Sequence, residues 1–245
     1  MNLEEYKGVF VFAQQVDNVI SNIAYELIGK GKELAKDLGV EVTAVLVGSD
    51  VKGLADQLAE YGADKVIVVD DPELKEYRTE PYTHAIASVI KEFKPEIFLI
   101  GATAIGRDLG PRVCARIHTG LTADCTKLDI GDFPMNPVPG RETKHNQLLM
   151  TRPAFGGNTI ATIACPDFRP QMATVREGVM KKEILDADYK GEVINHDVAK
   201  YVPETDYVVK VIDRHVEKAK HNLKGAPIVI AGGYGMGSKE GFDML

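Results

Sequence analysis

Glycines dominate the strongest candidate for a ligand-binding segment, residues 232–238. Gly233, Gly235 and Gly237 follow a short apolar run typical of a strand, and a helix is expected after them. A strand, a glycine-rich turn and a helix in this order aim backbone N–H groups at an anion such as a phosphate. A nucleotide or another phosphate-bearing cofactor is therefore the first kind of ligand to consider.

Two known phosphate-binding patterns come close to this turn, and both fail. A P-loop has lysine and then serine or threonine after its last glycine, whereas Ser238 precedes Lys239 here. In the dinucleotide-binding pattern the third glycine follows the second by three positions, whereas the glycines of this turn are evenly spaced by two. The alternative, that the glycines only permit a tight turn, stays open.

A second candidate segment, residues 101–112, joins the carboxyl end of an expected strand to the start of an expected helix. Open α/β sheets bind their ligands at this edge. Arg107 and Arg112 suit a phosphate or a partner's carboxylate, because a guanidinium donates two parallel hydrogen bonds. The alternative is a solvated helix in which Asp108 and Arg112 form a surface pair that contributes roughly a few tenths of a kcal/mol.

The third candidate segment, residues 151–158, lies between two expected strands. It contains Arg152, Phe155 and Asn158 together with paired glycines at positions 156 and 157. Such a junction could bring the backbone close to a planar ligand. It could equally form a bend that packs against another subunit.

The remaining reactive side chains argue against covalent or metal chemistry. The six histidines are scattered without the spacing of a metal site, and none of the four serines lies in a nucleophile elbow. Cys114, Cys125 and Cys165 match no Cys-x-x-Cys pattern, and a plain buried thiol is the simplest interpretation of Cys114. We therefore predict no catalytic residue and no metal ligand. The chain is instead expected to bind another group, which carries out the reaction.

An α/β fold with a mostly parallel sheet flanked by helices must position these segments. Short apolar runs that suit buried strands alternate with helical spacing of apolar residues, and the connections are short. The expected strands are residues 9–13, 42–47, 66–69 and 97–100, and the expected helices are residues 23–38, 54–61, 82–93 and 105–117.

The middle of the chain changes character. Strands are expected at residues 148–150, 159–163 and 172–175 without helices between them, and we expect them to extend the sheet in mixed orientation. A proline-rich loop is expected at residues 133–140. The apolar run at residues 207–211 predicts a last strand of this domain.

Three parts are expected along the chain: a first domain at residues 1–205, a polar linker helix within 206–224, and the start of a second α/β domain at 225–245. A strand, a turn and half a helix cannot bury their own apolar faces. We therefore expect the second domain to be completed by residues outside this sequence or by another chain.

Composition narrows the class of protein. The chain has 245 residues, 44% of them hydrophobic, and 29 basic against 36 acidic residues give a net charge of −7. Without a dense Lys/Arg block, nucleic acid is not an expected partner. Neither a signal or transit sequence nor a stretch of membrane-spanning length is present, so we predict a cytoplasmic protein without membrane insertion.

Four pieces of this sequence, in this order, resemble the alpha subunits of electron transfer flavoproteins, and the resemblance covers nearly the whole chain. They are residues 101–113, the Gly157-Asn158 turn, residues 174–176 (Thr-Val-Arg) and, above all, the second-domain opening at residues 229–242. Each piece is weak alone, and together they are specific.

The resemblance implies a heterodimer with a beta subunit. Its first alpha domain, adenine-nucleotide-hydrolase-like in fold, packs on the beta subunit, while the second binds FAD and swings between electron donor and acceptor. The resemblance implies cofactor contacts at Gly233, Tyr234, Gly235 and Ser238. It also implies an acyl-CoA dehydrogenase-type or other flavoenzyme as acceptor.

Residues 151–158 are closer to anaerobic members, which take electrons from NADH and bifurcate them, with ferredoxin as a possible acceptor. In those members a second FAD lies in the beta subunit near the first alpha domain. As a hypothesis drawn from this resemblance, Arg152, Phe155 and the loop around Arg107 border that second flavin, and Asn158 is a further cofactor-binding residue.

Two departures limit what the resemblance implies. The chain ends before the family's main FAD-binding segments, the Ser-Arg and Gln-Thr-Gly stretches, so it is not expected to retain the alpha flavin tightly by itself. Tyr234 stands where many members have arginine, and tyrosine offers a hydroxyl or a ring but no cation.

Two other functions remain open from the residues. One is a regulatory module of the same architecture that binds an adenine nucleotide without electron transfer. The other is an interaction scaffold whose glycine loops only shape turns. The leading interpretation is an electron carrier subunit in which FAD supplies the redox chemistry.

Overall fold

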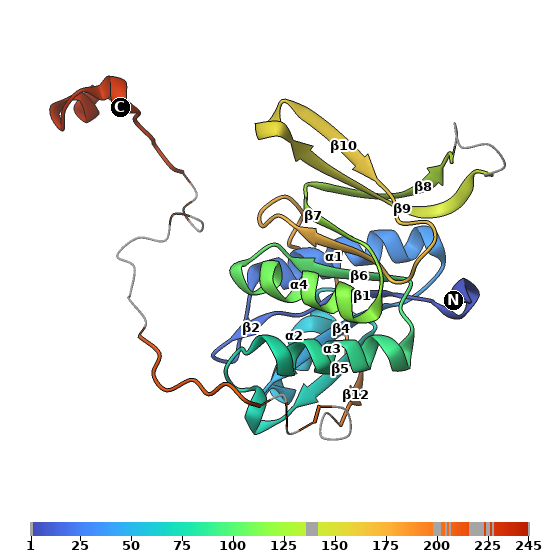
Figure 1. Cartoon of the computed structure of the whole chain (residues 1–245). Coiled ribbons are helices and arrows are strands. Elements are labelled where there is room, and N and C mark those ends of the chain that lie inside the picture. Colours follow the sequence, from blue (N-terminus) through green and yellow to red (C-terminus); the bar gives the residue numbers. More distant parts are fainter. Residues whose placement is uncertain are drawn as a thin grey trace. The chain divides into compact units, whose positions relative to one another are not determined.

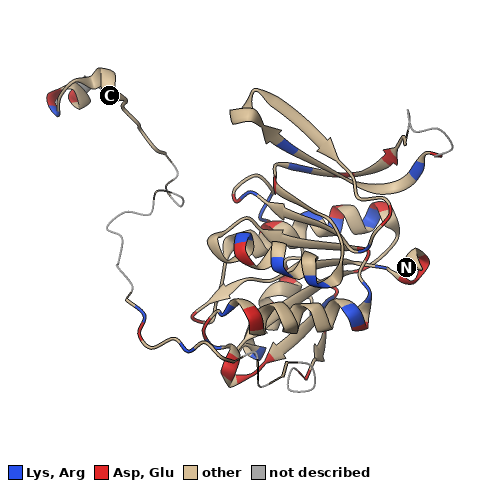
Figure 2. Ribbon diagram, in the orientation of Figure 1, with Lys and Arg blue, Asp and Glu red and all other residues tan. Residues whose placement is uncertain are grey.

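The computed structural model describes residues 2–135, 142–197, 202–203, 205, 207–215, 223, 226 and 228–244. Contacts divide the chain into two compact units, Met1–Lys210 and Val211–Leu245. The first unit contains the helices and sheets labelled in Figure 1. Figure 2 shows basic and acidic residues interspersed over these elements, in agreement with the absence of a basic block in the sequence.

A parallel sheet forms the centre of the first unit. Its strand order is β12-β5-β4-β1-β6-β11-β7, and every pairing in it is parallel. The predicted α/β fold with helices flanking a mostly parallel sheet is therefore confirmed. The strands are β1 Val9–Phe12, β4 Val42–Gly48, β5 Lys65–Asp70, β6 Ile97–Gly101, β7 Leu121–Cys125, β11 Gln171–Val175 and β12 Glu192–Asn195.

Helices cover both faces of this sheet, because its strands carry apolar side chains on both sides. In β1, Val9 and Val11 join one buried cluster with helices α1 and α2, whereas Phe10 and Phe12 join the other with α3 and α4. Helix α1 ends as predicted at Gly39, whose φ of 68° closes the last turn. The helices are α1 Asn22–Leu38, α2 Ala55–Glu60, α3 Thr79–Phe93 and α4 Ala104–Ile117, with short 3₁₀ turns η1 Leu3–Glu5, η2 Lys52–Leu54 and η3 Pro72–Leu74.

A separate antiparallel sheet contains β8 Lys127–Phe133, β9 Lys144–Ala154 and β10 Thr159–Ile163, drawn green to yellow in Figure 1. The prediction that residues 148–150 and 159–163 extend the main sheet is wrong, because β9 pairs with β8 and β10 and its buried Leu148 and Met150 pack on the α1 side of the core. Of the three predicted segments, residues 172–175 alone join the main sheet, as strand β11, which pairs in parallel with its neighbours. Most of the predicted proline-rich loop lies outside the described residues. A small hairpin, β2 Gln15–Val16 and β3 Val19–Ile20, completes the strands.

The predicted strand at residues 207–211 is also wrong. The edge of the sheet next to β5 is taken by β12, which the sequence analysis missed. Residues 207–209 instead contact Arg78. Its guanidinium lies 5.2 Å from the centre of the Tyr207 ring, and its Nη1 donates a hydrogen bond to the Val209 carbonyl at 3.0 Å. The predicted linker helix lies largely outside the described residues, and Arg214 is not helical.

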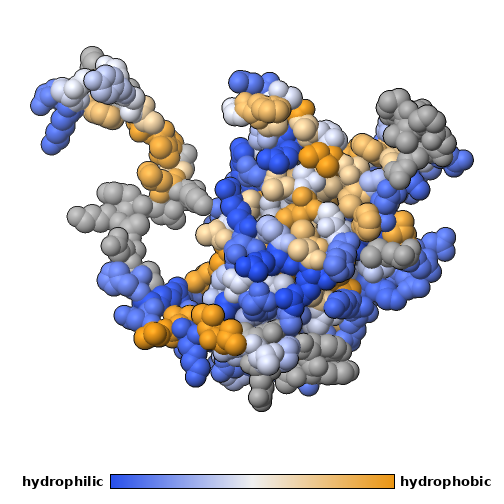
Figure 3. Space-filling model, viewed as in Figure 1, coloured by the Kyte–Doolittle hydropathy of each residue, from blue (hydrophilic) through white to orange (hydrophobic). Residues whose placement is uncertain are grey.

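In the second unit, residues 228–231 do not form the predicted strand. The side chains of Ile228 and Ile230 are 80% and 66% exposed, and among the residues of this unit that the structure describes no strand pairs with them. Figure 3 shows this apolar stretch in orange next to the C-terminal turns. Those turns are the 3₁₀ helices η7 Tyr234–Met236 and η8 Glu240–Met244. A single strand forms no ladder without a neighbour, which explains the difference from the prediction.

None of the described helices is both long enough and apolar enough to cross a membrane.

A buried carboxylate on α1 fixes the segment that follows β11. Glu26 is 7% exposed, and its Oε2 accepts hydrogen bonds from the backbone N–H groups of Gly178 at 3.0 Å and Met180 at 3.3 Å. Burial is the main cause that raises the pKa of the Glu26 carboxyl, and these hydrogen bonds act in the opposite direction. The segment is therefore held by a charge that is costly to bury.

We expect Glu26→Gln to change how stability depends on pH. Because the pKa of Glu26 is raised in the folded state, its contribution to stability is complete below the ordinary carboxyl pKa of 4.5 and is lost as the pH rises through the folded value. Glutamine keeps an oxygen acceptor and buries no charge. The variant should therefore gain stability relative to the wild type as the pH rises from acidic to neutral.

Urea unfolding at a series of pH values measures this gain. Glu33→Gln is the matched control, since Glu33 lies on the same helix and is exposed beside Lys30. Parallel pH profiles for Glu26→Gln and the wild type would contradict the expectation.

Candidate functional site

The turn between β6 and α4 places Arg107 at the carboxyl edge of the parallel sheet. Thr103 caps α4: its hydroxyl accepts from the Gly106 N–H at 3.0 Å and donates to the side-chain oxygen of Gln14 at 2.6 Å. Arg107 lies on the first turn of the helix, and its Nε donates to the Ala102 carbonyl at 2.9 Å. Part of the guanidinium is thus fixed, while 64% of the side chain stays exposed.

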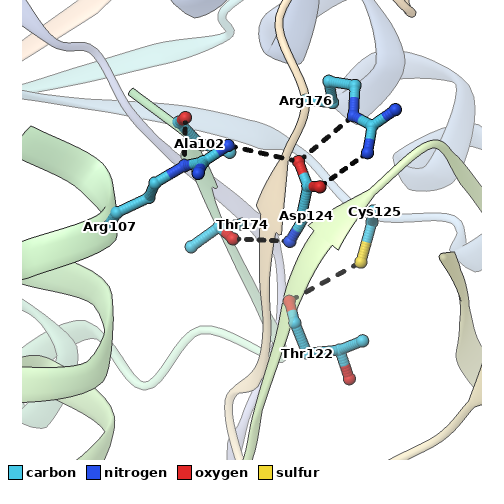
Figure 4. A network of polar contacts seen from close by, with 7 residues as sticks. All are labelled: Ala102, Arg107, Thr122, Asp124, Cys125, Thr174 and Arg176. Carbon is cyan, nitrogen blue, oxygen red and sulfur yellow. Dashed lines mark hydrogen bonds and ion pairs between the residues drawn. The ribbon is translucent and has the colours of Figure 1, made fainter. Parts of the chain in front are cut away.

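Asp124 joins this arginine to a second one (Figure 4). Its carboxylate accepts from Arg176 Nε at 3.2 Å and Nη2 at 2.6 Å, and Oδ1 lies 3.6 Å from Arg107 Nη2. The Asp124 N–H donates to the Thr174 hydroxyl at 2.9 Å. Three neighbouring strand ends, those of β6, β7 and β11, therefore meet in one polar network.

The charges of this network keep the carboxylate ionised. The hydrogen bond from Arg176 is the largest cause that lowers the pKa of Asp124; burial opposes it, and the charges of Arg107 and Arg152 add to it. In the neighbouring Cys125, burial raises the thiol pKa to about 12. This cysteine is therefore an uncharged thiol, which donates weakly to the Thr122 carbonyl.

Arg152 reaches the same region from the antiparallel sheet. It lies on β9, next to Thr151, whose carbonyl accepts from the Thr126 N–H at 2.9 Å, just after β7. The Arg152 side chain is half-buried, and its Nε is a buried donor without a hydrogen-bond partner among the described residues. The structure thus brings Arg107, Arg152, Asp124 and Arg176 together.

Phe155 and Asn158 lie in the turn that follows β9. The turn η4 Phe155–Gly157 places the Phe155 ring 86% in solvent, and φ is positive at Phe155, Gly156 and Gly157. The Asn158 N–H donates to the Phe155 carbonyl at 3.5 Å. An exposed aromatic ring on a turn with left-handed backbone is a feature that the packing of this chain alone does not explain.

The predicted cofactor residues of the glycine-rich turn lie in the second unit. Tyr234 is fully exposed, and a Cβ added at Gly233 or Gly235 would meet no atom within 4 Å. The φ of Gly237 is 69°. Ser238 is placed beside Glu240, and its hydrogen bond lowers the pKa of that carboxyl. The turn is therefore open on the side of these glycines.

Asp124 is the residue that the sequence analysis missed. It lies on a strand, β7, that was not predicted, and Arg176 was noted only within the resemblance. Among the described residues, no group of three or more His, Cys, Asp or Glu side chains could hold a metal ion.

Comparison with known proteins decides the family. The model of the electron transfer flavoprotein domain matches residues 9–201. The chain belongs to the electron transfer flavoprotein family. It is 47% identical to "Protein FixB" of Clostridium saccharobutylicum and 48% identical to "Electron transfer flavoprotein subunit alpha" of Clostridium acetobutylicum, in each case over 100% of this chain and 69–70% of the relative.

A more distant relative is "Lactate dehydrogenase (NAD(+),ferredoxin) subunit LctC" of Acetobacterium woodii, 36% identical over 98% of this chain and 54% of the relative. The resemblance to alpha subunits is thus confirmed, and the family role is electron transfer. A regulatory nucleotide-binding module is not favoured by these relatives.

Proposed function

We propose that this alpha-type chain pairs with a beta subunit and transfers electrons through FAD, with residues 1–205 as the docking domain and residues 225–245 as the opening of the flavin domain. The exposed apolar side chains of the β9–β10 hairpin support a docking role. Phe155 and Ile160 are 86% and 73% exposed on this hairpin. Exposed apolar patches of this kind mark interaction sites.

The open turn of the second unit fits the phosphate-bearing part of FAD. Backbone can approach a ligand closely where a glycine Cβ would meet no other atom, as at Gly233 and Gly235. Tyr234 offers a ring and a hydroxyl, and Ser238 offers a second hydroxyl. When bound, FAD supplies the redox chemistry, and the chain supplies position and electrostatics.

The arginines at the carboxyl edge fit a second flavin held mainly by the beta subunit. The single observation that carries this proposal is the buried, unpartnered Nε of Arg152, because native proteins rarely leave a buried donor without an acceptor. This nitrogen is covered by the chain itself, so a carbonyl or phosphate oxygen of the flavin would contact the part of the half-buried Arg152 side chain that solvent reaches. Phe155 and Asn158, on the turn after β9, would border the ring, and Arg107 would face the same flavin from α4.

The names of the relatives support the proposed donors and acceptors. LctC is named for NAD(+) and ferredoxin, and a relative from Anaerotignum propionicum, 43% identical, is an "Acryloyl-CoA reductase electron transfer subunit beta". We extend this to the present chain: NADH as donor, an acyl-CoA dehydrogenase-type flavoenzyme and ferredoxin as acceptors, and electron bifurcation between them. The cytoplasmic location stays a prediction from the sequence.

Co-expression with a beta subunit tests the proposal. We expect a copurifying yellow heterodimer with a visible flavin spectrum, because the beta subunit completes the surface around Arg152. The chain expressed alone, as the control, should be nearly colourless. A colourless monomer that binds adenine nucleotide would contradict the proposal in favour of a regulatory module, and one that binds neither would favour a scaffold.

A further inference from the structure

Asp124 adopts a backbone conformation that aims its carboxylate out of the regular strand. Its φ is 59°, in the left-handed region, and the register between β11 and β7 shifts at this point. The Asp124 N–H donates to the Thr174 hydroxyl instead of to a backbone carbonyl. Left-handed backbone in a non-glycine residue is uncommon and needs support from its surroundings. Here that support places one carboxylate between two arginines.

The four side chains of this cluster do not balance in charge. The single carboxylate of Asp124 interacts with three positive charges, those of Arg107, Arg152 and Arg176. The cluster therefore carries a surplus of positive charge, although the net charge of the chain is −7. The Arg107 and Arg176 side chains are 64% and 46% exposed, whereas that of Asp124 is 27% exposed. The guanidiniums of Arg107 and Arg176 are therefore more accessible to solvent than the carboxylate between them.

Both guanidiniums keep donors for a ligand. In Arg107, Nε donates to the Ala102 carbonyl and Nη2 pairs with the Asp124 carboxylate. In Arg176, both Nε and Nη2 donate to the same carboxylate. Among the described residues, the Nη1 group of each arginine has no partner. Two fixed guanidiniums with free edges suit an oxyanion, which accepts several charge-assisted hydrogen bonds at once.

We propose that Asp124 is a positioning residue, which holds Arg107 and Arg176 at the spacing that binds an oxyanion of the bound cofactor. The oxyanion is either a flavin phosphate or the ionised flavin ring. The assignment rests on the proposed function in one respect, because that function identifies the occupant as a flavin. The site itself is a property of this chain alone.

Asp124→Asn separates positioning from net charge. Asparagine tolerates left-handed backbone as aspartate does, so the fold should be kept. If net charge alone attracted the anion, removal of a carboxylate would tighten binding. If Asp124 acts by positioning, the two arginines lose their fixed spacing and binding weakens.

The first experiment titrates inorganic pyrophosphate into the 245-residue chain at low salt and follows the heat of binding. We expect binding by the wild type, weakened at least about fivefold in Asp124→Asn and in Arg176→Gln. Asp129→Asn, an exposed carboxylate of β8 beside Lys127, is the control and should bind as the wild type does. No binding by the wild type, or unchanged or tighter binding by Asp124→Asn, would overturn the proposal.

The second experiment uses the reconstituted heterodimer and identifies the source of the oxyanion. If the oxyanion is a flavin phosphate, Asp124→Asn should lower the retention of flavin but leave the reduction potential of the retained flavin unchanged. An ionised ring predicts a shifted potential. If neither quantity changes, the proposal fails. A wild-type complex without flavin would refute the proposed function alone, because the pyrophosphate titration needs no flavin.

Discussion

Gly106→Ala should prevent stable folding of the first unit or lower its melting temperature by roughly 10 °C, which corresponds to about 3 kcal/mol in a domain of this size. A Cβ at position 106 would lie 1.8 Å from the Gly101 carbonyl oxygen and 2.9 Å from Ile100 Cγ2. The first of these atoms belongs to the backbone of β6 and cannot rotate away. The start of α4 must therefore move off the sheet.

The propensity of alanine for helices does not rescue this substitution. Alanine is favoured over glycine in a helix by about 1 kcal/mol, which is less than the cost of an overlap with a backbone atom. Displacement of the helix also weakens the bond between the Gly106 N–H and the Thr103 hydroxyl, and it moves Arg107 away from Asp124. The substitution should therefore lower the stability of the fold and also disturb the pairing of Arg107 with Asp124.

Thermal melts followed by far-ultraviolet circular dichroism measure the effect. Gly53→Ala is the matched control, since a Cβ there meets no atom within 4 Å, and its stability should stay within about 0.5 kcal/mol of the wild type. If Gly106→Ala melted within a few degrees of the wild type, the close approach of α4 to β6 would be refuted.

Local patterns were sufficient to predict the centre of the fold. The β-branched runs of β1, β4, β5 and β6 are buried on both faces, and Leu109 and Val113 lie on the buried face of α4 as the helical spacing predicts. In each case the same residues determine the local conformation and the burial. The position of residues 101–112 at the carboxyl edge of the sheet follows from this order of strands and helices.

Pairing between distant segments could not be predicted in the same way. Residues 207–211 have a stronger strand pattern than β12, yet the edge beside β5 is already occupied by β12, and Arg78 fastens Tyr207 and Val209 instead. The carboxylate of Asp124 was missed for a related reason. β7 mixes polar and apolar residues, and the role of Asp124 depends on Arg107 and Arg176 from two other elements.

Arg152→Ala should reduce the flavin bound at the alpha–beta interface at least about tenfold without loss of stability of the chain. Hydrogen bonds to a charged group contribute about 1.5–3 kcal/mol, which is a factor of ten or more in affinity. In the chain alone, the buried Nε has no partner among the described residues. Its removal therefore breaks no hydrogen bond of the folded chain and relieves an unsatisfied donor.

This combination distinguishes a ligand-binding arginine from a structural one. A structural arginine would lower the melting temperature of the isolated chain when it is replaced, whereas Arg152 should leave that temperature unchanged or raised. Arg112→Ala is the matched control, because Arg112 is 59% exposed and forms a surface pair with Glu80 at 3.3 Å. Such pairs contribute only about 0–1 kcal/mol and should not affect flavin.

Visible absorbance per heterodimer, NADH oxidation and ferredoxin reduction are the readouts for the complex, and a thermal melt is the readout for the chain alone. Arg152→Lys should restore part of the flavin content, since an ammonium supplies the charge but not the planar donor pair of a guanidinium. The role of Arg152 would be refuted if flavin content and both activities of Arg152→Ala equalled those of the wild type. It would also be refuted if the variant lost flavin only in proportion to a loss of folded chain.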